Sequence, residues 1–301
     1  MSRLIQSRLI RILVALGVFG AAVAWFVSAT HPRDMAGFAG RTGDKARGAQ
    51  VFWASGCASC HMAPGATGDA QLVLAGGQSF TTAFGTFLAP NISPDPDHGI
   101  GEWSLAEFVH AVQDGVTPNN QHEFPAMPYV AYAKMVPQDV LDLKTFMDTL
   151  PPSTAASLPH QVGFPFNIRR ALGGWKFLFG SDAYVLQGTL TPEVERGRYI
   201  AEAMAHCGEC HTPRNLLGGL QKSSWLGGAA VLDGKGRVPN ITPGKLKWTE
   251  DEMFTYMTTG QTPSFDFVGG AMAHVVDNMA RLPEADVRAV VAYLKAVPAV
   301  P

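Results

Sequence analysis

Cysteine is scarce in this chain, which has four among its 301 residues. All four belong to two short motifs, Cys57, Cys60 and His61, and Cys207, Cys210 and His211. No thiol remains outside these motifs, which excludes a disulfide framework. Charged residues are also few, at 16% with a formal net charge of −2, so no nucleic-acid partner is expected.

The motif Cys-x-x-Cys-His has a chemical reason for its spacing. Two thiols three positions apart can each add to one vinyl group of a single haem, and the next residue then places an imidazole on the iron. The two motifs therefore predict two covalently bound haem c groups. The predicted attachment residues are Cys57, Cys60, Cys207 and Cys210, and the predicted iron ligands are His61 and His211.

Two other sites use paired cysteines. Two Cys-x-x-Cys pairs can hold one zinc ion, and thioredoxin-like redox sites have the same spacing. Zinc ribbons, however, bring their pairs close together in sequence, whereas these pairs are 150 residues apart. Neither alternative explains a histidine directly after both pairs, so haem attachment is favoured.

Long hydrophobic runs are missing except at the N-terminus. Residues 12–29 carry no charge and are long enough to cross most of a bilayer as a helix. Arg3, Arg8 and Arg11 precede them, which predicts that this end stays in the cytoplasm. A cleaved signal peptide is the competing interpretation, but its apolar core would be about 7 to 15 residues long. We expect residues 1–30 to be a retained anchor in the bacterial inner membrane, with the haem domains on the periplasmic side.

The remaining charge is unevenly distributed. Residues 31–160 carry 6 Lys and Arg against 12 Asp and Glu, whereas residues 161–301 carry 14 against 13. An acidic first half can steer a basic partner, although acidic surfaces are more often simply solvated.

Past the predicted anchor the chain repeats itself with an offset that drifts from 150 to 145 residues. Such a repeat predicts two copies of one fold in tandem. We expect domains at residues 40–151 and 191–299, joined by a linker at 152–190. The matched pairs are Arg47-Gly48 with Arg196-Gly197, Pro90-Asn91-Ile92-Ser93 with Pro239-Asn240-Ile241-Thr242, Trp103 with Trp248, Met127 with Met272, and Leu150-Pro151 with Val297-Pro298.

Each copy predicts a helix before its motif and another at its end, because apolar residues recur there at helical spacing. Pro137 and Pro283 open the two closing helices. Gly48 and Gly197 would let the first and last helices of each copy cross closely. The apolar stripes are Ala46, Ala49, Phe52 and Trp53; Val194, Ile200, Ala201 and Met204; Val140, Leu143, Phe146, Met147 and Leu150; and Val287, Val290, Val291, Leu294 and Val297.

Each copy resembles a class I cytochrome c domain. The tandem is similar to the multihaem cytochrome c subunits of bacterial membrane-bound alcohol, gluconate and sugar dehydrogenases, which commonly carry three haem motifs and a signal peptide. The resemblance covers nearly all of residues 40–299. It depends on PNIS at 90–93, GIGEWS at 99–104, PAMPY at 125–129, HCGECHTPRN at 206–215 and GAMA at 270–273, with FPFN at 164–167 and GGWK at 173–176 in the linker.

The resemblance implies a mainly α fold, two tandem class I cytochrome c domains joined by a wrapping linker. It also implies a methionine as the sixth iron ligand, and the repeat register selects Met127 and Met272, with Met135 and Met279 as runners-up. The carbonyls of Pro90 and Pro239 are implied as partners that orient the ligating imidazoles.

The matched tryptophans and the other histidines have less specific roles. Trp103 and Trp248 could bond haem propionates or simply lie in the core. The other histidines, His98, His110, His122, His160, His206 and His274, are expected at the surface or in loops.

Two six-coordinate haems would leave no iron position for a substrate, which predicts electron transfer without bond chemistry. We expect a periplasmic or membrane dehydrogenase as donor, and an oxidase, the quinone system or another cytochrome as acceptor. Two alternatives stay open. One is a two-haem enzyme of the peroxidase or thiosulfate dehydrogenase type, and the other is a cytochrome subunit of a haem-copper oxidase.

Overall fold

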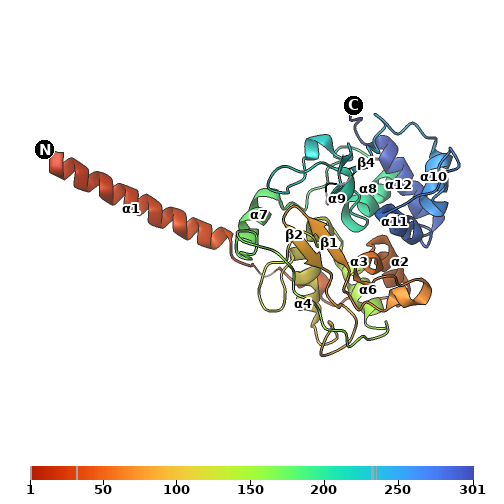
Figure 1. Cartoon of the computed structure of the whole chain (residues 1–301), viewed down its shortest axis with the longest axis horizontal. Coiled ribbons are helices and arrows are strands. Elements are labelled where there is room, and N and C mark those ends of the chain that lie inside the picture. The colour runs from red at the N-terminus through yellow and green to blue at the C-terminus, as the bar shows by residue number, and fades with distance from the viewer. Residues whose placement is uncertain (1, 32, 232–233, 235) are drawn as a thin grey trace.

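The computed structural model describes residues 2–31, 33–231, 234 and 236–301, and the side chains of residues 2–5, including the predicted flanking Arg3, lie outside the description. The described chain is mainly helical, with two short pairs of strands. It forms a body of two halves from which one helix projects (Figure 1). The predicted mainly α fold is confirmed.

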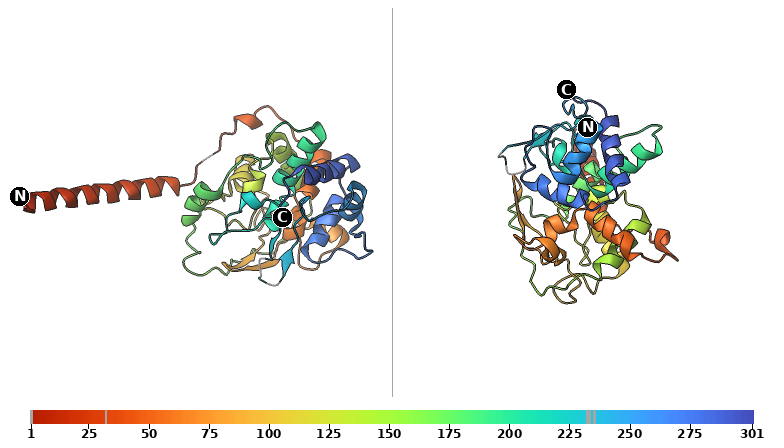
Figure 2. Two further views of the ribbon diagram at one scale, coloured as in Figure 1. Left: turned by 90° about the horizontal axis from the view of Figure 1, so that it is seen from above. Right: turned by 90° about the vertical axis from the view of Figure 1, so that its right-hand side faces the viewer.

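The projecting helix is α1 (Ser2–Val27). Within its residues 6–27, an 18-residue window has a mean hydropathy of 2.2 and is not buried against the protein. It is the one helix in the described part of the chain that is long and apolar enough to cross a membrane. Figure 2 shows that it leaves one side of the body and touches little else.

The first half, residues 36–151, winds short helices around long loops. Its two strands form an antiparallel hairpin that pairs Ser79 with Leu88. The elements are η1 (Ala36–Phe38), α2 (Lys45–Ala54), α3 (Cys57–His61), η2 (Gly68–Leu72), β1 (Ser79–Thr82), β2 (Gly85–Leu88), α4 (Leu105–Val109), the π-helical turn η3 (His110–Asp114), α5 (Tyr129–Tyr132) and α6 (Pro137–Met147).

The second half, residues 191–301, repeats this plan after a linker that contains α7 (Ala171–Phe179). Its strands are only two residues each. The elements are α8 (Pro192–Tyr199), the π-helical turn η4 (Ile200–Met204), α9 (Gly208–His211), η5 (Lys222–Ser224), β3 (Ala229–Ala230), β4 (Arg237–Val238), α10 (Glu250–Thr259), α11 (Ala271–Met279) and α12 (Glu284–Ala296).

The first and last helices of each half cross at a glycine, as the sequence predicted. A β-carbon on Gly48 in α2 would lie 2.0 Å from the carbonyl oxygen of Asp142 in α6. A β-carbon on Gly197 in α8 would lie 1.8 Å from the carbonyl oxygen of Ala289 in α12. No side chain fits at these distances, so both crossings require glycine.

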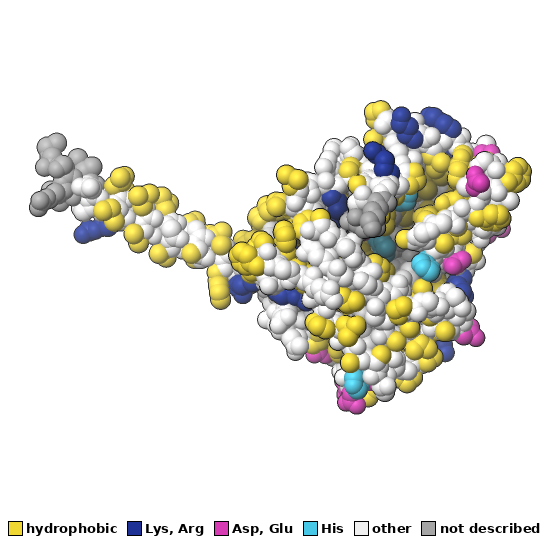
Figure 3. Space-filling model, in the orientation of Figure 1, with side chains coloured by type: hydrophobic (Ala, Val, Ile, Leu, Met, Phe, Trp, Pro, Cys, Tyr) yellow, Lys and Arg dark blue, Asp and Glu magenta, His cyan; other side chains and the backbone are white. Residues whose placement is uncertain are grey.

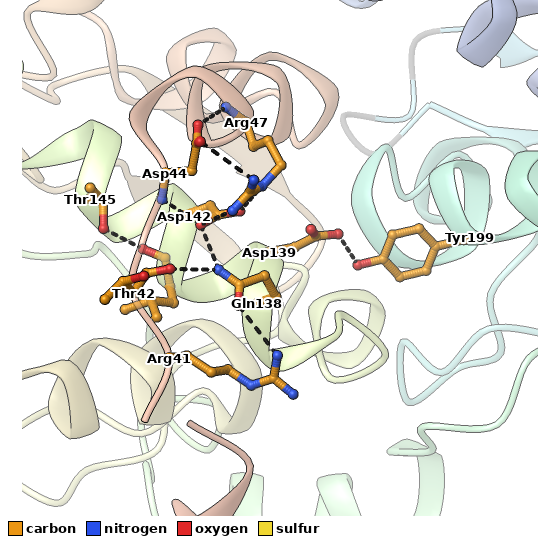
Figure 4. A network of polar contacts seen from close by, with 10 residues as sticks. Arg41, Thr42, Asp44, Arg47, Gln138, Asp139, Asp142, Thr145 and Tyr199 are labelled. Atoms are coloured by element: carbon orange, nitrogen blue, oxygen red, sulfur yellow. Dashed lines mark hydrogen bonds and ion pairs between the residues drawn. The ribbon is translucent and has the colours of Figure 1, made fainter. Parts of the chain in front are cut away.

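A polar network fixes the α2–α6 crossing (Figure 4). The carboxylate of Asp142, which is fully buried, accepts hydrogen bonds from the backbone N–H of Asp44 (2.6 Å), from Nε of Arg47 (2.7 Å) and from Nε2 of Gln138 (2.8 Å). The Arg47 bond counters the desolvation of the carboxylate, so that the pKa of Asp142 is lowered. A buried charge is tolerated here because several donors satisfy it.

The two halves share one apolar core. Buried side chains of the first half, such as Phe52 and Val140, are continuous with Ile200 and Val287 of the second. Polar contacts cross the boundary as well. The hydroxyl of Tyr199 donates to the Asp139 carboxylate at 2.5 Å, as Figure 4 shows.

Candidate functional site

Both haem motifs lie on short helices that place their histidine against a proline carbonyl. Nδ1 of His61 lies 2.9 Å from the carbonyl oxygen of Pro90. Nδ1 of His211 lies 2.8 Å from the carbonyl oxygen of Pro239. Because a carbonyl only accepts, each Nδ1–H is the donor and each Nε2 keeps its lone pair. This is the tautomer that a haem iron needs from an axial imidazole.

The histidines are also held in the neutral state. Burial lowers the pKa of His61 and of His211, and the hydrogen bonds to the proline carbonyls only partly oppose this. A neutral imidazole is the form that ligates a metal.

A glycine in each half allows the proline to approach the motif. The N–H of Gly76 bonds to the carbonyl of His61, and the N–H of Gly228 bonds to that of His211, both at 2.7 Å. The two glycines have φ values of +73° and +87°, and a β-carbon would lie 2.5 Å from Pro90 and 2.8 Å from Asn240. The left-handed backbone and the lack of space both require glycine.

The asparagine after each proline ties this segment to the stretch of chain that follows the last helix of its half. Nδ2 of Asn91 donates to the carbonyl of Ser153 (2.7 Å), and its Oδ1 accepts from the N–H of Ser93. Nδ2 of Asn240 donates likewise to the carbonyl of Val300 (2.9 Å), and its Oδ1 accepts from Thr242. The repeat of Pro-Asn-Ile-Ser as Pro-Asn-Ile-Thr marked both asparagines in the sequence, but it did not indicate which carbonyls they bind.

The cysteines are unlike those of redox or zinc sites. Burial raises the pKa of Cys57 and of Cys207 to about 12, and that of Cys60 to about 11. A reactive redox pair needs a lowered thiol pKa instead. Among the described residues, no three His, Cys, Asp or Glu side chains converge as a metal site. The first cysteine of each pair lies at the start of a short helix that its neutral imidazole ends, which fits haem attachment.

The methionines separate into two groups by burial. Met127 and Met272 are half-buried at the edge of the core. Met135 and Met279, the runners-up, are 4% and 1% exposed and fill the core itself. The structure thus leaves the first pair partly accessible and encloses the second in packing.

The matched tryptophans lie at the margin of the core. Trp103 and Trp248 are half-buried and pack against it. The ring of Trp248 meets the ring of Tyr256 edge to face, with centroids 5.2 Å apart.

Two histidines expected at the surface or in loops lie in loops, but their rings contact distant parts of the chain. His122 is 5% exposed, because Nε2 contacts the carbonyl oxygen of Ser28 at 3.0 Å and so joins the body to the end of α1. His206 is half-buried, with its ring against Tyr132 (5.7 Å between centroids). Both contacts join segments far apart in the sequence, which local patterns do not reveal.

Comparison with known proteins identifies the family of this chain. The model of the cytochrome c family matches residues 45–151 and 194–298. A diheme cytochrome c-type protein of Cereibacter sphaeroides is 52% identical over 302 residues, which is 100% of both chains.

Subunits of dehydrogenases are also similar. The fructose dehydrogenase cytochrome subunit of Gluconobacter japonicus is 37% identical over 84% of this chain and 52% of its own length. The cytochrome c subunit of a quinone alcohol dehydrogenase of Gluconobacter oxydans is 33% identical over 85% and 55%. The chain therefore spans all of the C. sphaeroides protein but about half of these two subunits.

Proposed function

Because the chain belongs to the cytochrome c family and carries two covalently attached haem c groups, we propose that it relays single electrons from a periplasmic dehydrogenase to the respiratory chain. In this proposal α1 holds it to the bacterial inner membrane with the body on the periplasmic side. Residues 40–151 and 191–299 are the two haem-binding domains. Each bound haem supplies a one-electron couple between ferric and ferrous iron.

The residues of each site have two roles, haem attachment and iron ligation. Cys57 and Cys60 hold one haem, and Cys207 and Cys210 hold the other. His61 and His211 would ligate iron through Nε2, oriented by the carbonyls of Pro90 and Pro239. Met127 would be the second protein ligand of one iron and Met272 that of the other. Since neither iron would then keep an open position for a substrate, the chain would move electrons only.

One observation carries this proposal: the same arrangement of histidine, proline carbonyl, glycine and asparagine occurs in both halves. An enzyme with two haems needs one iron that differs from the other, with an open or unusual ligand set. The two equal sites favour two equal relay stations instead. Relatives that are dehydrogenase cytochrome subunits support a dehydrogenase as the donor.

The test is purification of the haem-loaded chain in mild detergent with its native partners. We expect a dehydrogenase to co-elute, and its substrate to reduce both haems in a stopped-flow spectrometer. The relay would be contradicted if the resting absorption spectrum showed a high-spin haem and the protein turned over peroxide. Co-elution of haem-copper oxidase subunits as the stoichiometric partner would contradict the proposed donor.

A further inference from the structure

Six large apolar side chains stand exposed around α7. We call them the apolar collar. Their exposed fractions run from 47% to 97%, which is far above the core values. The collar consists of Phe164, Phe166, Phe177, Leu178, Leu216 and Leu217.

These side chains form one surface although they come from three segments. Nε1 of Trp175 in α7 donates to the carbonyl of Leu217 at 2.8 Å. The ring of Phe84 meets that of Phe166 edge to face, with centroids 5.1 Å apart, and also borders Gly218. The linker, α7 and the loop after the second haem motif therefore meet here.

The collar is held firmly from inside. Nζ of Lys176 donates to the carbonyls of Asp114 and Gly115 at 2.5 and 2.7 Å. It also lies 4.5 Å from the centre of the Tyr129 ring. This inward anchor fixes α7 to the first half, while the next two residues, Phe177 and Leu178, stay exposed at 71% and 64%.

The collar adjoins the place where α1 enters the body. Gly173 of α7 packs on Ser28, where a β-carbon would lie 2.6 Å from the backbone. The Arg170 guanidinium lies 3.7 Å from the centre of the Trp25 ring and donates to the Trp25 carbonyl at 2.7 Å. Figure 3 shows apolar side chains gathered at this junction. A tryptophan and an arginine at one end of a membrane span are typical of the headgroup layer.

The segments that form the collar contain cations but no acidic residue, although Glu209 pairs with Arg214 at 2.5 Å. No Asp or Glu occurs in residues 149–181 or 210–232, whereas these stretches contain Arg169, Arg170, Lys176, Arg214 and Lys222. The first half as a whole is acidic, so this region stands apart. Of these cations Arg170 and Lys222 are exposed, and exposed cations beside an apolar patch complement a layer of anionic phospholipid headgroups.

We propose that the apolar collar is a second membrane contact, which inserts into the headgroup layer of the bilayer that α1 crosses. It rests on the proposed function in one respect, the anchoring by α1. Since α1 joins the body through a short connection, the collar sets the tilt of the two haem domains over the membrane. It thereby fixes which faces remain open to donor and acceptor.

The position of the collar favours lipid over a protein partner. It is continuous with the end of the membrane-spanning segment, so a crossing α1 brings it to the bilayer surface. Another exposed aromatic pair, Phe265 and Phe267, lies between α10 and α11, on the side of the body away from α1 in Figures 1 and 2. That pair provides a matched control.

Spin labels test the proposal on the full haem-loaded chain in vesicles of phosphatidylcholine and phosphatidylglycerol. The native thiols are consumed by haem, so a single cysteine is introduced by Leu178→Cys, by Phe265→Cys as the control, or by Val18→Cys within α1. Oxygen concentrates in lipid, whereas a nickel chelate stays in water. We expect oxygen to increase the spin-relaxation rate of the label at position 178 severalfold more than the nickel chelate does, and the reverse at position 265.

The label within α1 separates the two proposals. If position 18 is lipid-embedded but position 178 is as open to the nickel chelate as position 265, the collar proposal is overturned and anchoring stands. If position 18 is open to water too, the anchoring itself is wrong. A label at position 178 that is immobilised only on addition of a dehydrogenase would show a protein-docking surface instead and overturn the proposal.

A second measurement needs no label. In oriented membrane multilayers, the electron paramagnetic resonance signals of the ferric haems in the native protein should depend on the angle between the membrane plane and the magnetic field. The double variant Phe177→Ser with Leu178→Ser should lose this dependence, whereas Phe265→Ser with Phe267→Ser should keep it. An unchanged angular dependence in the first variant would contradict the proposal, and its haem absorption spectrum shows that it has folded.

Discussion

The hydroxyl of Tyr132 donates a 2.7 Å hydrogen bond to the carbonyl oxygen of Ser55, two residues before the first haem motif. The ring of the same tyrosine meets the ring of His206, one residue before the second motif. Burial lowers the pKa of His206, so a neutral ring lies against the tyrosine. Tyr132 thus contacts the entry to both motifs, and the two halves are joined where the haems attach.

Removal of this hydroxyl should weaken the protein. Tyr132→Phe leaves the buried Ser55 carbonyl without its donor, which should cost about 1–3 kcal/mol of unfolding free energy. Tyr129→Phe is the matched control, because its buried hydroxyl has no hydrogen-bond partner among the described residues. Denaturant unfolding of the haem-loaded protein should show a loss for the first variant and none for the second. Equal losses would mean that the Ser55 bond contributes nothing.

The sequence predicted the parts of the fold that follow from local patterns. Helical spacing and an opening proline located α6 at Pro137–Met147, and the glycine at each helix crossing proved necessary. The hairpin β1–β2 and the helix α7 were not predicted, since Gly and Pro obscure short elements in loop-rich sequence. Tertiary contacts decide such elements more than propensity does.

The site was predictable in its chemistry but not in its support. Covalent haem attachment imposes a fixed spacing on Cys57, Cys60 and His61, so the motif can be recognised from the sequence alone. The hydrogen bond from Asn91 to Ser153 spans 62 residues, and no local pattern encodes such a distance. The burial of His122 depends equally on a distant partner, Ser28.

Loss of a proposed methionine ligand should change one haem at a time. Met127→Ala and Met272→Ala should each lower one reduction potential, by on the order of 0.1 V within the span of about 0.8 V that axial ligands set. Each should also open one iron to carbon monoxide. Redox titration and the carbon monoxide difference spectrum measure both effects.

Two buried methionines serve as controls for that experiment. Met135→Ala and Met279→Ala should destabilise the protein by about 2–5 kcal/mol through cavities, without opening an iron. If they bind carbon monoxide and the first pair does not, the ligand assignment is wrong.

The contribution of Glu123 to stability should fall as pH rises through the range in which this carboxyl group titrates. Burial raises the pKa of Glu123 from 4.5 to about 7, and Lys176 and Arg169 only partly oppose this. At Glu123 the folded state therefore binds more protons than the unfolded state between these values, so the contribution of Glu123 to the unfolding free energy declines from about pH 4.5 to 7. Glu123→Gln should flatten that decline in denaturant titrations at several pH values. A decline of the same slope in the variant would show that another group causes it.

Adding a β-carbon at Gly197, where two helices of the second half cross, should destabilise the protein. Gly197→Ala would bring that carbon to 1.8 Å from the Ala289 carbonyl oxygen and 2.9 Å from Cβ of Tyr293, which forces α8 and α12 apart. We expect the unfolding free energy to fall by about 3 kcal/mol or more, at the upper end of overpacking effects.

The control is Gly174→Ala in α7, where no atom lies within 4 Å of the new carbon. The better helix propensity of alanine should add about 0.5–1 kcal/mol to the unfolding free energy there. Thermal unfolding of the haem-loaded variants should lower the midpoint for the first and leave it unchanged or raised for the second. Similar midpoints for both would refute the need for glycine at this crossing.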